Sequence, residues 1–213
     1  MSFTLLALLI KAAGLTVAIS GVSILLGLAL GFVISAASLS RNPLLRVPAK
    51  LYVSFFRGVP LLVQLLLIYN LLPAIGLDVP GVVAAVVGLT LCTSAYQAEN
   101  LRGGFLSVPP GLLEAADMAG LDAFQQFRRI RAPIAFSLTL PVLVSEAIMI
   151  LKASSLVSVV GVIELTRMAQ DLASSTYRPL PMFATAGLLY LVIDWTVAGF
   201  GHVLERRARW GRA

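Results

Sequence analysis

The sequence is poor in the residues from which catalytic and metal sites are built. It has one cysteine, Cys92, and one histidine, His202, in 213 residues. A lone cysteine forms no disulfide within its chain, and a lone histidine has no cysteine or second histidine with which to share a metal. No lysine follows a glycine, so there is no Gly-x-x-x-x-Gly-Lys phosphate loop, and no Gly-x-Ser-x-Gly elbow occurs. We therefore expect no enzyme activity, no metal and no cofactor in this chain.

Charge is also scarce. Charged residues make up 12% of the chain, against about 25% in soluble domains, and hydrophobic residues make up 59%. A soluble domain with this balance could not cover its surface with polar groups. The composition predicts an all-α integral membrane protein, with residues 1–213 forming a single domain.

Five apolar runs are long enough to cross a bilayer, which takes about 20 residues per helix. The five runs are Ala12–Ser40, Gly58–Leu77, Val79–Ala98, Ala132–Leu151 and Pro179–Leu204. We expect Ser2–Ile10 to be a separate short helix at the outer leaflet. The mixed, Ser/Thr-rich stretch Ala153–Arg178 is expected to be short and amphipathic or re-entrant rather than a sixth span. The first run holds a small-xxx-small pair, Gly27 and Gly31, which favours helix contact either within the chain or with a second subunit.

The distribution of basic residues orients these spans. With the N-terminus outside and the C-terminus inside, twelve of the sixteen lysines and arginines face the cytoplasm, as the positive-inside rule requires. The twelve are Arg41, Arg46, Lys50, Arg57, Arg102, Arg128, Arg129, Arg131, Arg206, Arg207, Arg209 and Arg212. These basic residues gather at the ends of the spans rather than in one stripe interleaved with aromatic residues. This distribution predicts that they contact membrane lipid and that the protein binds no nucleic acid.

One polar segment, residues 99–133, separates the third and fourth runs. Pro109-Pro110-Gly111 is typical of a loop that enters the first turn of a helix. Gly120 is placed to end that helix, and Asp122 with Gln125 forms a capping box that begins a second one. The segment therefore predicts two short helices joined at a glycine, a suitable docking element for a soluble partner.

This segment resembles a known motif. Glu114-Ala115-Ala116, followed by Gly120 and Pro133, is similar to the EAA motif, the coupling segment in permeases of ABC importers. Other runs resemble, in the same order, the permeases for polar amino acids. These runs are RGVPLLVQ from Arg57 to Gln64, SAYQAENLRGG from Ser94 to Gly104, LKASSL from Leu151 to Leu156 and GVIEL from Gly161 to Leu165. The sequence departs from the family pattern at Val59, Ala132 and Ala153, where the family has threonine, leucine and aspartate.

The resemblance implies a non-catalytic, multi-pass permease of the type I ABC-importer kind in the bacterial cytoplasmic (inner) membrane. It implies three partners: a second permease, identical or homologous, a dimer of ATP-binding subunits that binds ATP and Mg, and an extracytoplasmic amino-acid-binding protein. It also implies that ATPase motion reaches the membrane through the motif residues Glu114, Ala115, Ala116, Gly120 and Pro133.

Polar side chains inside the apolar runs are candidates for a substrate pathway, because such groups are costly in the bilayer unless they face a wet cavity. The candidates are Arg57, Gln64, Ser94, Gln97, Glu146 and Lys152. The alternative is that these groups only hold helices together. Asp194 is a further intramembrane carboxylate that a basic residue of a second permease could neutralise.

Glu146 directs the substrate prediction, because a buried carboxylate attracts a cationic group and repels an anionic one. The Ser145-Glu146 pair also resembles the Asn-Glu pair of histidine and basic amino acid permeases. We expect import of a cationic or amphoteric amino acid such as arginine, histidine or an opine. The alternatives are a glutamine, glutamate or cystine permease, and an ion-coupled transporter that uses Glu146 or Asp194, although no internal repeat supports the latter.

Overall fold

A computed structural model describes residues 3–74 and 76–209, and within them every regular element is helical. The elements are α1 (Phe3–Leu39), α2 (Pro43–Gly58), α3 (Leu61–Ala74), α4 (Gly81–Leu106), α5 (Pro110–Met118), α6 (Ala123–Gln126), η1 (Phe127–Arg131), α7 (Ala132–Ala153), η2 (Ser154–Val160), α8 (Leu165–Thr176) and α9 (Pro179–Arg209). In the described part of the chain, α1, α4, α9 and the continuous helix from residue 123 to 160 are long and apolar enough to span a membrane.

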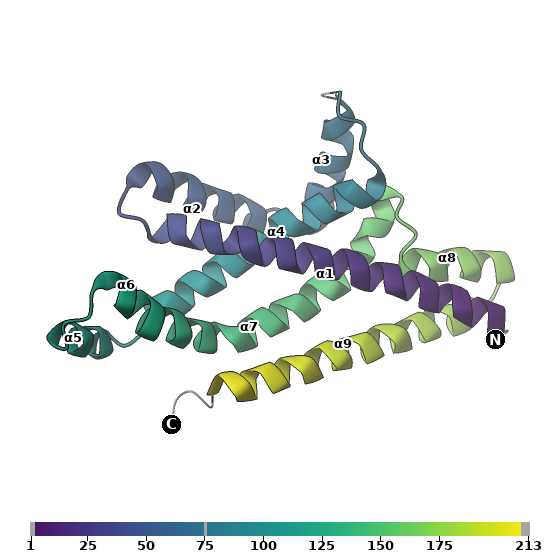
Figure 1. Cartoon of the computed structure of the whole chain (residues 1–213). Helices are drawn as coiled ribbons and strands as arrows, with labels where there is room; N and C mark the ends of the chain where they lie inside the picture. The colour runs from purple at the N-terminus through teal and green to yellow at the C-terminus, as the bar shows by residue number, and fades with distance from the viewer. Residues whose placement is uncertain (1–2, 75, 210–213) are drawn as a thin grey trace.

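The long helices α1, α4, α7 and α9 extend between the two ends of the bundle, and α1 crosses α4 and α7 obliquely (Figure 1). Helices α5 and α6 lie at one end of this bundle, where α9 also ends, and α8 lies at the other end beside the start of α1 (Figure 1). We call the end with α5 and α6 the basic end, because residues 128, 129, 131, 206 and 207 place five arginines there. The charge distribution assigns this end to the cytoplasm.

Two glycines of α1, Gly27 and Gly31, let it pack closely on α4. A Cβ at Gly31 would lie 3.0 Å from the carbonyl oxygen of Ser94 and 3.1 Å from the backbone nitrogen of Ala98, and a Cβ at Gly27 would overlap the side chain of Thr93. Only glycine permits this approach between backbones. The Gly27/Gly31 pair therefore makes a contact within the chain.

The prediction of a separate helix over Ser2–Ile10 was wrong in its described part, because α1 is continuous from Phe3 to Leu39. The exposed Lys11 lies within it and does not interrupt it. A lysine near the end of a span can extend its ammonium group toward the interface while its aliphatic stem stays in the apolar layer, so the charge is no helix-stop signal.

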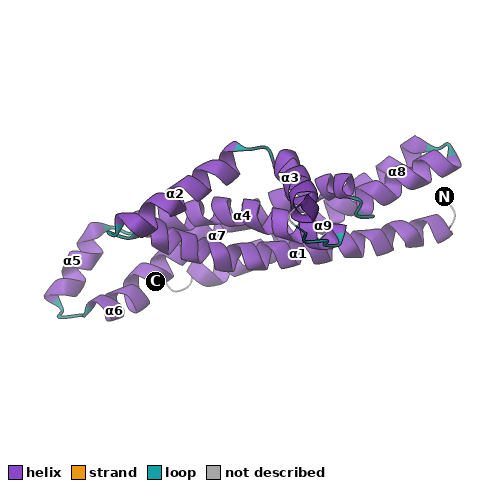
Figure 2. Ribbon diagram, turned by 90° about the horizontal axis from the view of Figure 1, so that it is seen from above, coloured by secondary structure: helices purple, strands orange, loops and turns teal. Residues whose placement is uncertain are grey.

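The predicted second span, Gly58–Leu77, is divided in the structure. Helix α2 already begins at Pro43, ends at Gly58, and meets α3 at a bend of 108°. Val59 is extended at this bend because the following Pro60 disfavours the helical conformation in the residue before it. Helix α3 has 14 residues and stands across the bundle axis, as both views show (Figures 1 and 2). The number of spans reaches five only if this bent pair counts as one.

Residues 153–178 form the expected short amphipathic stretch, a 3₁₀ turn (η2) followed by α8. The apolar face of α8, which includes Leu165, Ala169 and Leu172, packs against α1 and α9. The buried Glu164 caps α8: its carboxylate accepts hydrogen bonds of 2.8 Å from the backbone nitrogens of Thr166 and Arg167. This cap is well satisfied, which explains why a carboxylate is tolerated here.

Candidate functional site

The predicted turn between the two short helices has the hydrogen bonds of a Schellman motif. Gly120 adopts φ +71°, its backbone nitrogen donates to Asp117, and the nitrogen of Leu121 donates to the carbonyl oxygen of Ala116, both at 3.0 Å. This pattern satisfies the last carbonyls of α5 and requires a left-handed residue at its centre. The sequence prediction that Gly120 ends the first helix is confirmed.

The second helix begins with the predicted capping box. The Gln125 backbone nitrogen donates to the Asp122 carboxylate at 2.8 Å, and the Asp122 nitrogen donates to the Gln125 side chain at 3.2 Å. A further residue, Gln126, connects the two helices: its amide donates to the carbonyl oxygen of Leu121 at 3.0 Å and to the Asp117 carboxylate. Sequence reasoning missed Gln126, because no local motif marks a bond to a residue nine positions away.

The second short helix does not end before the fourth span. Helix α6 continues through one π-helical turn, η1, into α7, where the nitrogen of Ala132 donates to the carbonyl of Phe127. Pro133 has no N–H and its ring would clash with a carbonyl four residues earlier in a regular α-helix, so the wider turn accommodates it. Phe127 also stacks on Phe105 of α4, with ring centroids 6.0 Å apart. Helix α6 and η1 thus form a continuous extension of α7.

The outer surface of this segment is exposed and partly apolar. Glu114 and Ala115 are exposed, whereas Ala116 is buried and holds α5 in place. The side chains of Met118 and Phe124 are 90% and 70% exposed. Large exposed apolar side chains beside a carboxylate are typical of a protein-binding surface.

A second group of polar side chains comes from α2, α4 and α7. Glu146 of α7 is buried, and its Oε1 atom has no hydrogen-bond partner among the described residues. The Arg57 guanidinium lies 5.3 Å from the ring centroid of Tyr96, and both Arg57 and Tyr96 are within electrostatic range of Glu146. A cation, an anion and an aromatic ring on neighbouring helices are groups of the kinds that bind a zwitterion.

The structure places Arg57 in the last turn of α2, beside Tyr96, which lies ten residues before the end of α4 at Leu106. The prediction that Arg57 faces the cytoplasmic side stays a prediction.

Two of the candidate pathway residues have hydrogen bonds that hold helices together. The Gln64 amide donates to the carbonyl oxygens of Phe56 and Val59, at 2.8 and 2.7 Å, and so closes the bend between α2 and α3. The Ser94 hydroxyl shares a 2.7 Å bond with the Tyr52 hydroxyl and donates to the carbonyl of Leu91. Both side chains thus contribute to helix contacts, and their place in a substrate pathway stays a prediction.

The two remaining candidate pathway residues are Gln97 and Lys152. Gln97 is buried beside Gly31, and its Oε1 atom has no partner among the described residues. Lys152 is exposed at the end of α7, where its Nζ atom lies 3.2 Å from Oδ2 of Asp194. Asp194 is therefore neutralised within the chain, and Lys152 is not the partner of Glu146.

The chain belongs to the family of binding-protein-dependent transport system inner membrane components, whose family model matches residues 23–210. It is 39% identical over 198 residues to the probable amino-acid ABC transporter permease protein YckA of Bacillus subtilis, covering 93% of this chain and 88% of that one. It is 38% identical over 193 residues to the octopine transport system permease protein OccM of Rhizobium radiobacter, covering 86% and 78%. A crystal structure of an amino acid ABC transporter with histidines superposes with a TM-score of 0.88 at 35% identity, covering 94% of each chain.

The protein is thus a permease subunit of an ABC importer, a non-catalytic component of the inner membrane. The family implies an ATPase partner and a substrate-binding protein. These relatives support the permease prediction rather than an ion-coupled transporter. They also agree with the all-helical architecture, which in the described residues contains no strand.

Proposed function

We propose that this permease imports an amino acid with a cationic or amphoteric side chain, such as arginine, histidine or an opine. The observation that carries the proposal is Glu146, a buried carboxylate with an unpartnered oxygen on α7. An unpaired buried charge costs several kcal/mol, so a cationic ligand that pairs with it gains that energy. The names of the octopine permease and of the transporter crystallised with histidines point to the same class of substrate.

Arg57 and Glu146 would bind opposite ends of such a substrate. The guanidinium of Arg57 is exposed and would receive the α-carboxylate, while Glu146 would receive the cationic side chain. Tyr96, against which Arg57 already lies, would supply an aromatic face to the substrate. A substrate with an anionic side chain would meet Glu146 with like charge, which disfavours glutamate.

Coupling to ATP would travel along one helix. The exposed residues Glu114, Ala115 and Met118 would dock on a dimer of separate ATP-binding subunits, which binds ATP and Mg. Because α6, η1 and α7 are continuous, a tilt at Ala123 would be carried to Glu146, 23 residues and about 35 Å away along the same helix. Such rigid-body motion would switch the site between outward and inward access, with an extracytoplasmic amino-acid-binding protein as the donor.

A second permease, identical or homologous, would cover α3. This helix is too short to cross a bilayer of about 30 Å, and it exposes Val63, Leu67 and Leu71. A helix standing across the bundle axis with apolar residues on its open side needs a protein neighbour, because lipid alone leaves its ends unsupported.

The test is uptake of labelled arginine by proteoliposomes that contain the permease with its ATPase and binding protein. Glu146→Gln should lower uptake about tenfold or more, since a charged hydrogen bond is worth roughly 1.5–3 kcal/mol. Basal ATP hydrolysis and complex assembly should stay unchanged, and Glu146→Asp, which keeps the charge, should retain most uptake. Unchanged uptake by Glu146→Gln would remove Glu146 from the pathway and leave it as a helix-packing carboxylate.

A further inference from the structure

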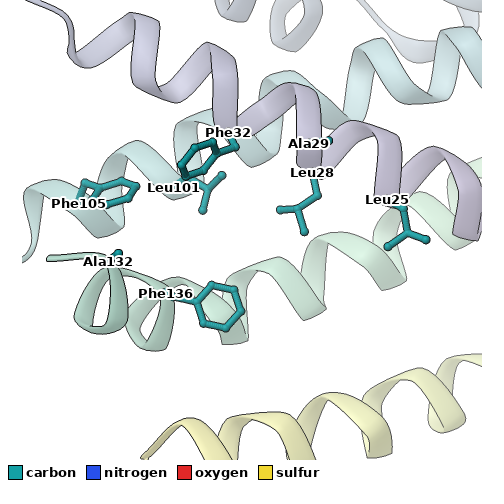
Figure 3. A pocket seen from close by; sticks show the side chains of 8 residues that line it. All are labelled: Leu25, Leu28, Ala29, Phe32, Leu101, Phe105, Ala132 and Phe136. Atoms are coloured by element: carbon teal, nitrogen blue, oxygen red, sulfur yellow. The ribbon is translucent and has the colours of Figure 1, made fainter. Parts of the chain in front are cut away.

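An apolar groove runs along the bundle from its middle to its basic end. Its deeper part, with a volume of about 700 Å³, lies between α1, α4 and α7, and a second part of about 510 Å³ continues to the end of α1. Phe32 and Phe105 line both parts, so the two form one groove. Side chains of α1 and α4 point into it opposite Ala132 and Phe136 of α7 (Figure 3).

The groove is long enough to hold an acyl chain of one leaflet. On α1 it extends from Leu25 to Leu39, fourteen residue steps or about 21 Å along the helix. Half of the hydrocarbon layer is about 15 Å thick. The lining of the deeper part is made only of leucine, alanine and phenylalanine, so a hydrocarbon chain, and not a polar substrate, is its complementary ligand.

The mouth of the groove carries a positive charge. Arg131 lines it at the basic end, is exposed, and forms no ion pair with any residue in the described part of the chain. Beside it, Phe127 stacks on Phe105 and forms an aromatic wall next to the arginine. An apolar groove that ends at an exposed arginine is complementary to an anionic phospholipid.

We propose that this groove binds one anionic phospholipid of the cytoplasmic leaflet, with an acyl chain along α1 and its phosphate on Arg131. The bound lipid would contact η1, the turn that joins the coupling segment to α7. It would therefore support the continuous helix formed by α6, η1 and α7, through which the ATPase is proposed to act. A transmembrane helix in the same groove would leave Arg131 without an anion, which makes lipid the better occupant.

Quenching of a single tryptophan by brominated lipid tests this proposal. Phe32→Trp places the reporter inside the groove, in a Trp195→Phe/Trp210→Phe background of the full-length chain in nanodiscs. Dibrominated phosphatidylglycerol should quench it at about fivefold lower mole fraction than dibrominated phosphatidylcholine, because one arginine at the membrane surface contributes about that preference. The control is a chain that keeps Trp195 alone, which is 67% exposed on α9 and should show no preference.

Removal of the charge should remove the preference. Arg131→Gln should bring the two quenching curves together, Arg131→Lys should retain their separation, and Arg41→Gln, an equal loss of charge outside the groove lining, should leave it unchanged. Equal quenching by both lipids in the Phe32→Trp reporter with Arg131 intact would show that the groove is filled by boundary lipid without head-group preference, and would overturn the proposal. No quenching by either lipid would show that a protein surface covers the groove, and would overturn it equally.

Discussion

The Nζ atom of Lys152, at the end of α7, lies 3.2 Å from Oδ2 of Asp194 on α9. This ion pair joins two helices through residues that are 42 positions apart in the chain. The two partners are unequal: the side chain of Lys152 is 62% exposed, whereas that of Asp194 is 12% exposed. Loss of the lysine would leave a buried carboxylate without its cation. Loss of the carboxylate would leave only a solvated lysine.

We therefore predict that Lys152→Met destabilises the protein by about 1–3 kcal/mol, less than for a fully buried pair because water reaches the lysine. The double variant Lys152→Met/Asp194→Asn should recover most of that loss. Thermal unfolding of both variants in detergent measures the difference. Equal destabilisation of the single and double variants would show that the pair does not join α7 to α9.

Glu164 at the start of α8 predicts a dependence of stability on pH. Burial raises the pKa of its carboxyl group, and the hydrogen bonds from Thr166 and Arg167 only partly oppose the shift. A raised folded-state pKa contributes stability that is fully present below the unfolded value of about 4.3 and is lost as the pH rises through the folded value.

As the pH rises above the unfolded pKa of about 4.3, the unfolding temperature of the native chain should accordingly fall relative to that of Glu164→Gln, which cannot ionise. The comparison uses the two proteins in the same detergent, scanned at each pH. Parallel curves would show that Glu164 keeps an ordinary pKa in the folded protein.

The positive-inside assignment predicts which residues face the cytoplasm. In a Cys92→Ser background, Ser174→Cys on α8 should react with an impermeant maleimide on intact cells, and Ala123→Cys on α6 should react only after the membrane is permeabilised. Both positions are exposed, so access through the membrane decides the outcome. Labelling of both cysteines on intact cells would contradict the prediction that α6 and α8 lie on opposite sides of the membrane. Labelling of Ala123→Cys alone on intact cells would show that the orientation is the reverse of the predicted one.

The sequence predicted local features of the coupling segment accurately because their signals are local. Gly120 and the Asp122/Gln125 pair each act within a few residues of their position, so the helix end and the capping box followed from the sequence alone. The bend at Val59 was missed although Pro60 signalled it, because the apolar run continues unbroken across it.

Other features depend on contacts that no spacing rule reveals. The bonds of Gln64 across the bend, the pairing of Lys152 with Asp194 and the approach of Gly31 to Ser94 all join separate helices. For the same reason, the sequence identified Glu146 as an intramembrane carboxylate but did not predict its nearness to Arg57. That nearness depends on α2 running back along the bundle.

The central claim is that the rigid coupling segment transmits ATPase motion to α7, and the left-handed turn at Gly120 tests it most directly. Gly120→Val should strain this turn by roughly 1–2 kcal/mol and detach α5 from α6, whereas Gly120→Asn should preserve the turn, since asparagine tolerates positive φ. ATP hydrolysis and arginine uptake are measured together in the same proteoliposomes with the ATPase and binding protein. We expect Gly120→Val to insert and assemble but to take up far less arginine per ATP hydrolysed, and Gly120→Asn to match the native ratio. A native ratio of uptake to hydrolysis in Gly120→Val would contradict the account.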